Sequence, residues 1–455
     1  MQLSIVVLAA GQGKRMRSAL PKVLQRLAGK PLLAHVLDVA AALNCDDTVV
    51  VYGHGGDQVQ AAFPDSELKW AHQAEQLGTG HAVKMAMPSV ADDRLALVLC
   101  GDVPLLTAPT LERLVEQCAD GSVGVLTVDL DDPTGYGRII RDDEGQVRAI
   151  VEQKDASAEQ LAVREINSGV ICAPSTELRR WLDALSADNA QGEYYLTDII
   201  GAAVADGIAV HAVKGDDPDE VMGINDRRQL AAAECLYQHR YANALLDAGV
   251  SLADPARIDV RGSLSAGHDT FIDVNCVFEG DVVLGDRVHI GPGAVIVDSE
   301  IGDDTVVHPH CVLEQARVGA RCQIGPFARL RPGAEFAEGA KAGNFVEVKK
   351  ARIGEGSKVN HLTYIGDATI GDKVNVGAGT ITCNYDGANK HHTTIGDDAF
   401  IGSGVNLVAP VDIGAGATIG AGSTIAKEAP AGKLTLNRAP VKTVDGWKRP
   451  VKKNK

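Results

Sequence analysis

Hydrophobic residues follow two different periods along the chain, and the change of period divides the chain into two parts. In the first part, short apolar runs alternate with segments whose apolar residues recur every three or four positions. The runs predict buried strands at residues 3–10, 47–52, 94–99 and 122–128. The other segments predict helices at residues 31–43, 80–87 and 108–118. This alternation is typical of an α/β, Rossmann-like domain whose mostly parallel sheet is covered on both faces and binds ligands at the carboxyl ends of its strands.

Helical spacing of apolar residues returns between residues 226 and 248, and Gly249 follows as a stop signal. We interpret this segment as a helix that joins two domains. A simpler interpretation makes it the last helix of the first domain, and the two are compatible. The predicted division is therefore residues 1–226, a linker helix at 227–248, and residues 249–455, which end in a tail.

In the second part the period becomes six residues. An aliphatic residue opens each unit and glycine usually follows, as at Ile290-Gly, Ile301-Gly, Ile324-Gly, Ile370-Gly and Ile395-Gly. Hexapeptide periodicity is the signature of a parallel β-helix, in which the aliphatic side chain points into the prism. We predict a left-handed parallel β-helix of roughly ten stacked coils.

Two segments interrupt the six-residue period. Residues 382–394 form a polar, histidine-bearing insertion that a regular prism cannot contain, and residues 341–350 bring charge into the repeat. A polar loop that leaves a rigid scaffold is favoured as a functional element, and a plain surface excursion is the alternative. The last residues, 447–455, are basic, which fits either a solvated tail or local attraction of a phosphorylated ligand.

Composition excludes several classes of protein. The 455 residues carry a net charge of −16 and a sequence pI near 5.3, so the chain is not built to coat nucleic acid or an anionic membrane. The 45% hydrophobic share is that of a globular protein, and no apolar run reaches membrane-spanning length. Residues 3–10 lack the preceding basic residue of a signal peptide, which favours an opening strand. Nine scattered cysteines without a Cys-X-X-Cys pair fit free thiols in the cytoplasm.

A glycine-containing loop follows the first predicted strand. Residues 8–16 read Leu-Ala-Ala-Gly-Gln-Gly-Lys-Arg-Met, which is neither the dinucleotide fingerprint nor a Walker loop. Glycines let the backbone approach a phosphate, although a tight turn alone would explain them. The cations Lys14, Arg15 and Lys22 add a second signal, and together they suit a nucleoside triphosphate that is attacked at its α-phosphate.

Asp102 directly follows the third predicted strand. A carboxylate at a strand end near a phosphate site is a good magnesium ligand, whereas an isolated aspartate is often only an Asx turn or a helix cap. Asn225, far off in sequence, can complete such a site with its amide oxygen, although spacing alone does not show that the two meet. Polar, glycine-containing turns at 73–81 and 135–138 offer donors and acceptors for a nucleobase and a sugar, and each taken singly is more often just a loop.

These motifs carry a resemblance. The first part resembles sugar-1-phosphate nucleotidyltransferases, and the full chain, from residue 3 to about 450, resembles bacterial bifunctional N-acetylglucosamine-1-phosphate uridyltransferase/glucosamine-1-phosphate acetyltransferases. Beyond the segments named above, the resemblance rests on residues 132–137, 189–195, 343–347, 361–364 and 378–389. Two small departures are Lys14, where threonine is frequent, and Cys100, where an aromatic residue is common. The resemblance implies a uridyltransferase domain at 1–226 and an acetyltransferase β-helix at 249–455.

For the uridyltransferase, the resemblance implies Mg²⁺ held by Asp102 and Asn225, with Arg15 and Lys22 stabilising the α-phosphate. It implies contacts to UTP or UDP-N-acetylglucosamine from Leu8, Ala9, Ala10, Gly11, Lys22, Gln73, Gly78, Thr79, Cys100, Gly101, Asp102, Gly137, Glu152, Asn167 and Asn225. The sugar phosphate is already an anion, so this transfer needs aligned anions and charge stabilisation rather than a protein base.

Acetyl transfer does need a base, because the amine of glucosamine 1-phosphate must shed a proton as it attacks acetyl-CoA. Histidine titrates near neutral pH, and His361, in a non-repeating stretch, is our candidate; a structural histidine is the alternative. The resemblance implies sugar-phosphate contacts from Arg331, Lys349, Tyr364, Asn375 and Asn384. It implies acetyl-CoA contacts from Ala378, Asn384, Tyr385, Ser403, Ala421 and Arg438, and the backbone amide of Ser403 suits the thioester oxyanion.

The implied product, UDP-N-acetylglucosamine, supplies precursors of peptidoglycan and lipopolysaccharide. The implied assembly is a homotrimer, because a single prism has flat sides and neighbouring copies would form the acetyl sites together. The partners are then small molecules, with no nucleic acid and no membrane. Two other hypotheses remain: a single-activity nucleotidyltransferase whose β-helix only trimerises or senses a ligand, and a non-catalytic sugar-nucleotide sensor.

Overall fold

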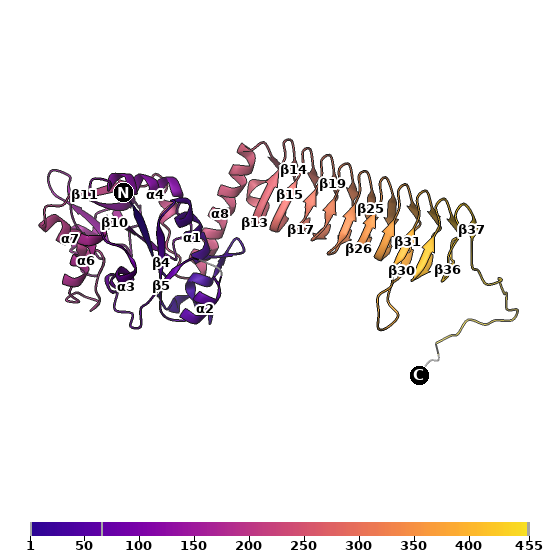
Figure 1. The fold of residues 1–455 in the computed structure, drawn as a ribbon, viewed down its shortest axis with the longest axis horizontal. Coiled ribbons are helices and arrows are strands. Elements are labelled where there is room, and N and C mark those ends of the chain that lie inside the picture. The colour runs from indigo at the N-terminus through magenta and orange to yellow at the C-terminus, as the bar shows by residue number, and fades with distance from the viewer. Residues whose placement is uncertain (1, 65–66, 453–455) are drawn as a thin grey trace. The chain divides into compact units, whose positions relative to one another are not determined.

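The structure is a computed structural model that describes residues 2–64 and 67–452. It separates into two compact units whose boundary falls between Tyr237 and Gln238 (Figure 1). This boundary lies inside the long helix α8 (Arg227–Asp247), which occupies the segment where the sequence predicts a linker helix. The first part of α8 packs on the first unit through Leu230, Ala233 and Leu236, and Ala242 and Leu245 belong to the core of the second.

A nine-stranded sheet in the order β11-β7-β10-β6-β1-β4-β5 forms the centre of the first unit, with the hairpin β8–β9 attached to β10. Neighbours in this order are parallel except β10, which runs antiparallel to both β6 and β7, and the attached β8 is antiparallel to β9 and β10. The strands are β1 (Leu3–Leu8), β4 (Asp47–Tyr52), β5 (Lys69–His72), β6 (Leu95–Cys100), β7 (Val123–Asp129), β8 (Arg138–Arg141), β9 (Val147–Val151), β10 (Glu165–Pro174) and β11 (Val210–Lys214). A separate short pair is β2 (Arg26–Leu27) with β3 (Lys30–Pro31).

Helices flank this sheet and bury its two faces in separate hydrophobic cores. They are α1 (Leu32–Ala42), α2 (Gly56–Ala61), α3 (Thr79–Ala86), α4 (Ala108–Gln117), α5 (Ala158–Leu161), α6 (Ser175–Ala184) and α7 (Asp198–Ala205). The predicted strands and helices of this part are confirmed to within about two residues, because each is a continuous buried run or a clearly amphipathic segment. The antiparallel strand β10 was not predicted from the sequence.

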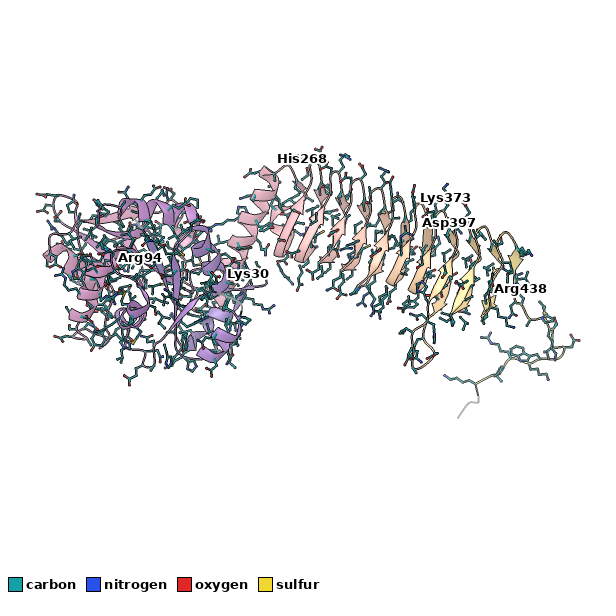
Figure 2. All side chains as sticks on the ribbon, in the orientation of Figure 1. Lys30, Arg94, His268, Lys373, Asp397 and Arg438 are labelled. Carbon is teal, nitrogen blue, oxygen red and sulfur yellow. The ribbon has the colours of Figure 1, made fainter. Side chains whose placement is uncertain are left out.

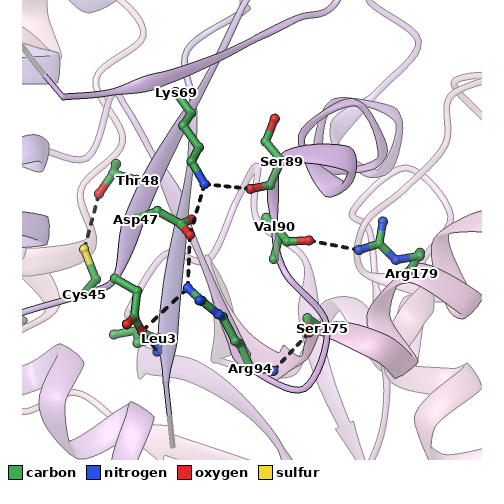
Figure 3. A network of polar contacts seen from close by, with 11 residues as sticks. Leu3, Cys45, Asp47, Thr48, Lys69, Ser89, Val90, Arg94, Ser175 and Arg179 are labelled. Atoms are coloured by element: carbon green, nitrogen blue, oxygen red, sulfur yellow. Dashed lines mark hydrogen bonds and ion pairs between the residues drawn. The ribbon is translucent and has the colours of Figure 1, made fainter.

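A polar network ties together the amino ends of the strands, on the side of the sheet away from the strand ends that bind ligands in such folds. Arg94, labelled in Figure 2, donates a 3.1 Å hydrogen bond to Asp47, and Lys69 lies 3.2 Å from the same carboxylate (Figures 2 and 3). Arg179 of α6 donates to the carbonyl oxygens of Met87 and Val90. These contacts fasten α6 and the sheet together at this end.

The second unit is a left-handed parallel β-helix, as predicted, with one continuous core along its axis (Figure 1). One face is an 11-stranded parallel sheet: β12 (Ser251–Leu252), β14 (Phe271–Ile272), β16 (His289–Ile290), β19 (Val306–Val307), β22 (Gln323–Ile324), β25 (Lys341–Asn344), β27 (Lys358–His361), β29 (Asn375–Val376), β32 (Phe400–Ile401), β35 (Thr418–Ile419) and β37 (Leu434–Thr435). On three successive coils the equivalent position is taken by Ile290, Val307 and Ile324, which pair with one another in the sheet and are fully buried.

A 15-stranded sheet supplies the rest of the prism. Its strands are β13 (Ile258–Ala266), β15 (Cys276–Leu284), β17 (Val295–Val297), β18 (Glu300–Ile301), β20 (Val312–Glu314), β21 (Arg317–Val318), β23 (Arg329–Leu330), β24 (Ala334–Phe336), β26 (Glu347–Ile353), β28 (Tyr364–Ile370), β30 (Ile381–Cys383), β31 (Thr393–Ile395), β33 (Asn406–Val408), β34 (Val411–Ile413) and β36 (Thr424–Ile425). Hydrogen-bonded partners on successive coils are 17 or 18 residues apart. The step from Asp372 to Asp397 takes 25 residues because the insertion lies between them.

The predicted insertion does leave the prism, as the loop between β30 and β31 (Figure 1). From β37 to residue 452 the chain is an irregular segment without helix or strand, and Arg438 lies at its start (Figure 2). Among the described residues, none of the helices combines the length and the apolar character that crossing a membrane requires.

Candidate functional site

A cavity of about 330 Å³ opens at the carboxyl ends of β1 and β6, beside the first residues of α3. Ten of the predicted nucleotide contacts line it: Leu8, Ala9, Ala10, Gly11, Lys22, Gln73, Gly78, Thr79, Cys100 and Asp102. The backbone amide of Gly101 donates 2.9 Å to the carbonyl oxygen of Leu8, so it holds the two strand ends together behind them. The sequence placed these residues in three separate segments, and the parallel sheet brings the segments to one edge.

A second hollow of about 570 Å³ continues from this cavity and shares Gly11, Lys22, Gln76 and Glu193 with it. Lys14, Arg15 and Asn225 line the second hollow. The predicted cations and both predicted metal ligands therefore belong to one continuous site. The arrangement offers a partly apolar chamber for a base and a cation-lined chamber for phosphates.

Two glycines of this site are required by geometry. Gly13 has φ near +60°, and a Cβ there would lie 2.6 Å from Cβ of Lys22. Gly78, with φ near +111°, would place a Cβ 2.6 Å from the carbonyl oxygen of Tyr194. Any side chain would therefore displace Lys22 or the Tyr194 backbone, which fixes the shape of both loops.

Lys22, Asp102 and Asn225 meet at the junction of the two hollows. The Lys22 ammonium donates a short hydrogen bond to Oδ2 of Asp102 and a 3.1 Å hydrogen bond to Oδ1 of Asn225. The backbone amide of Ile224 donates 2.9 Å to the carbonyl oxygen of Asp102, which brings the segment before α8 to this strand end. The two predicted metal ligands, whose meeting the spacing left open, therefore lie on either side of one shared partner, Lys22.

These side chains fit a divalent cation. A carboxylate oxygen and an amide oxygen converge on one positive charge, the ammonium of Lys22, and Mg²⁺ prefers oxygen ligands of this kind. Over residues 2–64 and 67–452, no group of three or more His, Cys, Asp or Glu side chains is arranged to hold a metal. Mg²⁺ commonly takes one or two protein ligands and completes its shell with water and substrate phosphates, so two protein oxygens suffice.

Cys100 ends β6 and lies in the cavity wall. Burial raises the pKa of its thiol to about 12, and the negative charge of Asp102 adds to the effect. The thiol therefore stays neutral and acts as a small apolar wall residue rather than as a nucleophile.

Three predicted contacts, Gly137, Glu152 and Asn167, form a neighbouring group. The backbone amide of Asn167 donates 2.9 Å to the Gly137 carbonyl oxygen, and a Cβ on Gly137 would lie 3.4 Å from Glu152. This group lies next to the cavity, because Gly169, two residues after Asn167, has its carbonyl oxygen 3.8 Å from the sulfur of Cys100 in the cavity wall. Burial raises the pKa of the Glu152 carboxyl, although a 3.2 Å hydrogen bond from Thr197 opposes the shift.

Some lining residues were not predicted as contacts. They are Gln12, Gly13, Val23, Gln76, Ala82 and Glu193. Glu193 lies in the segment 189–195 that supports the resemblance, so its motif was a usable signal, and Gln76 lies within the predicted turn 73–81. Val23 and Ala82 are ordinary apolar residues, and nothing in the sequence distinguishes them.

The second group of predicted residues lies on the β-helix, where backbone hydrogen bonds between coils align several of them along one edge. The amide of Gly379 donates 3.2 Å to the His361 carbonyl oxygen, that of Gly404 donates 2.7 Å to Ala378, and that of Gly422 donates 2.8 Å to Ser403. The carbonyl oxygen of Ala421 then accepts a 2.8 Å hydrogen bond from Nε of Arg438. His361 therefore shares an edge with the predicted acetyl-CoA contacts Ala378, Ser403, Ala421 and Arg438.

His361 ends strand β27 and is exposed, and Asn344, which ends β25, lies beside it as its partner in the sheet. Nδ1 of His361 lies 3.0 Å from Oδ1 of Asn344. A carbonyl-type oxygen only accepts, so this contact favours a proton on Nδ1, and in the neutral ring the lone pair is then on Nε2. This is the tautomer that a general base needs at Nε2.

Four of the five predicted sugar-phosphate contacts lie close together on neighbouring coils. Arg331 donates 2.8 Å to Glu347, which pairs with Tyr364 on the next coil, and Lys349 pairs with Gly366 in the same two strands. The amide nitrogen of Asn384 lies 3.5 Å from the hydroxyl of Tyr364 and donates a short hydrogen bond to Asp367. The fifth, Asn375, lies on the other sheet, where it pairs with Lys358.

The insertion carries Tyr385 and has its own internal contacts. The Asp386 carboxylate accepts hydrogen bonds from the backbone amides of Ala388 and Asn389 and from Nε2 of His391. The ammonium of Lys390 lies 4.3 Å from the centre of the Tyr385 ring. At the base of the loop, His392 and Thr369 form a 3.0 Å hydrogen bond that ties it to the prism.

Comparison with known proteins agrees with this division. A family model of the MobA-like NTP transferase domain matches residues 5–246. A model of the bacterial transferase hexapeptide, six repeats long, matches residues 267–297 and 392–427. Fold and site therefore define a nucleotidyltransferase that is continued by a hexapeptide-repeat transferase.

The full chain has relatives over nearly its entire length. It is 58% identical to the "Bifunctional protein GlmU" of Chromobacterium violaceum over 452 residues, which cover 99% of each chain. It is 57% identical to the protein of the same name from Azoarcus sp. over 450 residues, 99% of this chain and 100% of the relative. The chain belongs to the family of bifunctional GlmU proteins. It is an enzyme with uridyltransferase and acetyltransferase activities that acts on small molecules, so the hypothesis of a non-catalytic sensor is wrong.

Proposed function

We propose that the chain makes UDP-N-acetylglucosamine in two steps on two separate units. The acetyl group of acetyl-CoA passes to glucosamine 1-phosphate on the β-helix, and UMP then passes from UTP to N-acetylglucosamine 1-phosphate on the first unit. Residues 1–226 and 249–455 carry the two sites, with α8 between them. The observation that supports the first site best is the meeting of Lys22, Asp102 and Asn225 at the junction of a partly apolar hollow and a cation-lined hollow.

In uridylyl transfer, a phosphate oxygen of the sugar phosphate attacks the α-phosphorus of UTP, and the bond from that phosphorus to the bridging oxygen breaks to release pyrophosphate. The chain holds the two anions in line and stabilises the charge through Arg15 and Lys22. Asp102 and Asn225 would hold Mg²⁺, which would supply positive charge to neutralise the phosphates. The uracil enters the cavity lined by Gln73, and the sugar lies against Glu152.

Removal of the metal ligand tests this assignment. Asp102→Asn keeps the shape but loses the anionic oxygen, so uridylyl transfer is expected to fall at least about 100-fold while acetyl transfer stays at the wild-type rate. The measurement is pyrophosphate release from UTP and N-acetylglucosamine 1-phosphate, with coenzyme A release as the control. Uridylyl transfer at the wild-type rate in this variant contradicts the metal assignment.

In acetyl transfer, the amine nitrogen attacks the thioester carbonyl carbon, the carbon–sulfur bond breaks, and coenzyme A leaves as the thiol. Nε2 of His361 takes the proton that the amine loses. Arg331 and Lys349 suit the phosphate of the sugar, and Tyr364, Asn375 and Asn384 suit its polar groups. The edge of Ala378, Ser403, Ala421 and Arg438, with Tyr385 of the insertion, accommodates acetyl-CoA.

The role of His361 is tested by measuring thiol release from acetyl-CoA with and without glucosamine 1-phosphate. We expect release that depends on the amino sugar and that falls by about 100-fold or more in His361→Ala. The alignment of His361 with the predicted acetyl-CoA edge supports this result. Amino-sugar-dependent thiol release at the wild-type rate in His361→Ala contradicts the assignment of the base.

We also propose a homotrimer in which neighbouring copies complete the acetyl sites. Exposed apolar side chains follow the prism beside the base: Phe345 next to Asn344, and Leu362 next to His361, with 55% and 64% of their surfaces exposed. Burying them between copies would be favourable. Dilution is then expected to lower acetyl transfer per chain and to leave uridylyl transfer unchanged, in parallel with loss of the trimer in sedimentation.

The cytoplasmic location stays a prediction, and all nine cysteines carry free thiols, as that compartment requires.

A further inference from the structure

The two proposed metal ligands already share a cation that belongs to the chain. The ammonium of Lys22 bonds to Oδ2 of Asp102 and to Oδ1 of Asn225, so it occupies the point on which both oxygens converge. The same lysine is the residue that the uridylyl-transfer step needs on a phosphate. A metal ion bound to both oxygens and the ammonium cannot occupy this point together, because two cations so close to each other repel.

The arrangement is fixed by the fold rather than by a chance surface contact. The side chains of Lys22 and Asp102 are only 13% and 20% exposed. In the sequence, Lys22 is 80 residues from Asp102 and 203 residues from Asn225. The backbone hydrogen bond from Ile224 to Asp102 holds the segments of the two metal ligands together. A carboxylate buried to this degree is costly without a positive partner, so the ammonium compensates Asp102.

We infer that Lys22 is a placeholder for the divalent cation: its ammonium occupies the metal position in the ligand-free enzyme, and the incoming cation displaces it toward the phosphates. This inference rests on the proposed assignment of Asp102 and Asn225 as metal ligands and adds the order of events at the same site. Lysine suits such a role because its charge is compact and its four-carbon stem can swing. Metal binding and phosphate binding are then coupled, because the entering metal frees the ammonium of Lys22 to bind a phosphate.

The test is the affinity of the full-length, nucleotide-free enzyme for Mn²⁺ alone, measured by calorimetry on wild type and Lys22→Met. Methionine keeps the unbranched stem that packs beside Gly13 but cannot hold the two oxygens. We expect Mn²⁺ to bind Lys22→Met at least about tenfold more tightly than wild type, because it no longer competes with an ammonium.

Lys14→Met is the matched control. Lys14 lines the same hollow, so this variant removes the same charge through the same substitution, and its Mn²⁺ affinity should change by less than about twofold. Lys22→Gln serves as a second variant should Lys22→Met not fold, and a larger rise of melting temperature with Mn²⁺ than in wild type is an independent readout.

The outcomes separate the inference from the assignment on which it rests. Equal Mn²⁺ affinity in wild type and Lys22→Met, with binding lost in Asp102→Asn, overturns the placeholder and leaves the metal site standing. Equal tightening in Lys22→Met and Lys14→Met also overturns it, because the effect is then one of general charge. If Mn²⁺ binds none of the proteins, or binds Asp102→Asn as well as wild type, the metal assignment fails together with the inference.

Discussion

At the scale of single residues, the side chains proposed for chemistry are held by partners that the fold brings from elsewhere. Lys22 reaches Asp102 and Asn225 across 80 and 203 residues of sequence, and His361 reaches Asn344 on the preceding coil, 17 residues away. Each partner fixes the orientation of the side chain that it contacts. The residue scale therefore gives predictions about partners as well as about the reacting groups.

Asn344 is expected to act as a positioning residue for His361. Asn344→Ala leaves the imidazole without the acceptor that fixes its tautomer, so kcat of acetyl transfer should fall about 10- to 100-fold while KM for acetyl-CoA changes little. Asn344→Asp places a negative charge beside the ring and favours the imidazolium, so the acid limb of the pH–rate profile should move to higher pH. An unmoved profile in Asn344→Asp, with a normal rate in Asn344→Ala, contradicts this role.

Glu152 carries a stability cost that its proposed role in sugar binding would explain. Because burial raises its carboxyl pKa, the native state holds the proton more tightly than the unfolded state. The free energy of unfolding therefore falls as the pH rises from the pKa of the unfolded state toward the pKa of the folded state. At neutral pH, Glu152→Gln should therefore raise the melting temperature by about 2 °C, and the difference should vanish in acid below the unfolded pKa.

Glu165→Gln is the control for that measurement. Burial raises the pKa of Glu165 too, but hydrogen bonds from Arg141 and Thr127 outweigh it, and the net pKa is lowered. This variant should lower the melting temperature at neutral pH. If both variants shift stability in the same direction, the burial argument for Glu152 is wrong.

The KM for N-acetylglucosamine 1-phosphate should rise about tenfold in Glu152→Gln, because a charged hydrogen-bond acceptor is lost.

At the scale of elements, function is concentrated where regular structure stops. The nucleotide cavity lies where β1 and β6 give way to loops, and the proposed acetyl site lies where an insertion interrupts the coils. Strand and helix positions followed from local periods, which is why β1, β4, β6, α1, α3 and α4 were predicted closely. The antiparallel strand β10 was missed, since pairing direction depends on contacts between distant segments.

The insertion is expected to be held in shape by Asp386. Backbone hydrogen bonds from Asn389 first, and then the His391 ring, lower the pKa of its carboxyl, so the ionised form organises the loop at neutral pH. Asp386→Ala should loosen the segment that carries Tyr385 and raise KM for acetyl-CoA about fivefold, with uridylyl transfer unchanged. Asp412→Ala, an exposed aspartate on strand β34, is the matched control and should leave both activities as they are. A normal KM in Asp386→Ala means that the loop does not order acetyl-CoA.

At the scale of the whole molecule, the two units have separate hydrophobic cores. Leu97 is fully buried in the first unit and Ile324 is fully buried in the second, and they belong to different clusters. We expect two unfolding transitions in calorimetry. Leu97→Ala and Ile324→Ala should each destabilise its own unit by about 3 kcal/mol and lower only its own transition. A common downward shift of both transitions in either variant would show that the units unfold as one.

The sequence by itself determined the two-part organisation, the α/β alternation, the hexapeptide prism and the segments that carry chemistry, because these depend on local period and on residues close together in the chain. Tertiary structure decided which of those segments meet. It placed Asn225 against Asp102 with Lys22 between them, gave His361 its partner Asn344, and aligned His361 with Ala378, Ser403 and Ala421 on one edge. These contacts arise from the stacking of parallel strands and coils, in which neighbours in space are far apart in sequence, so no local pattern encodes them.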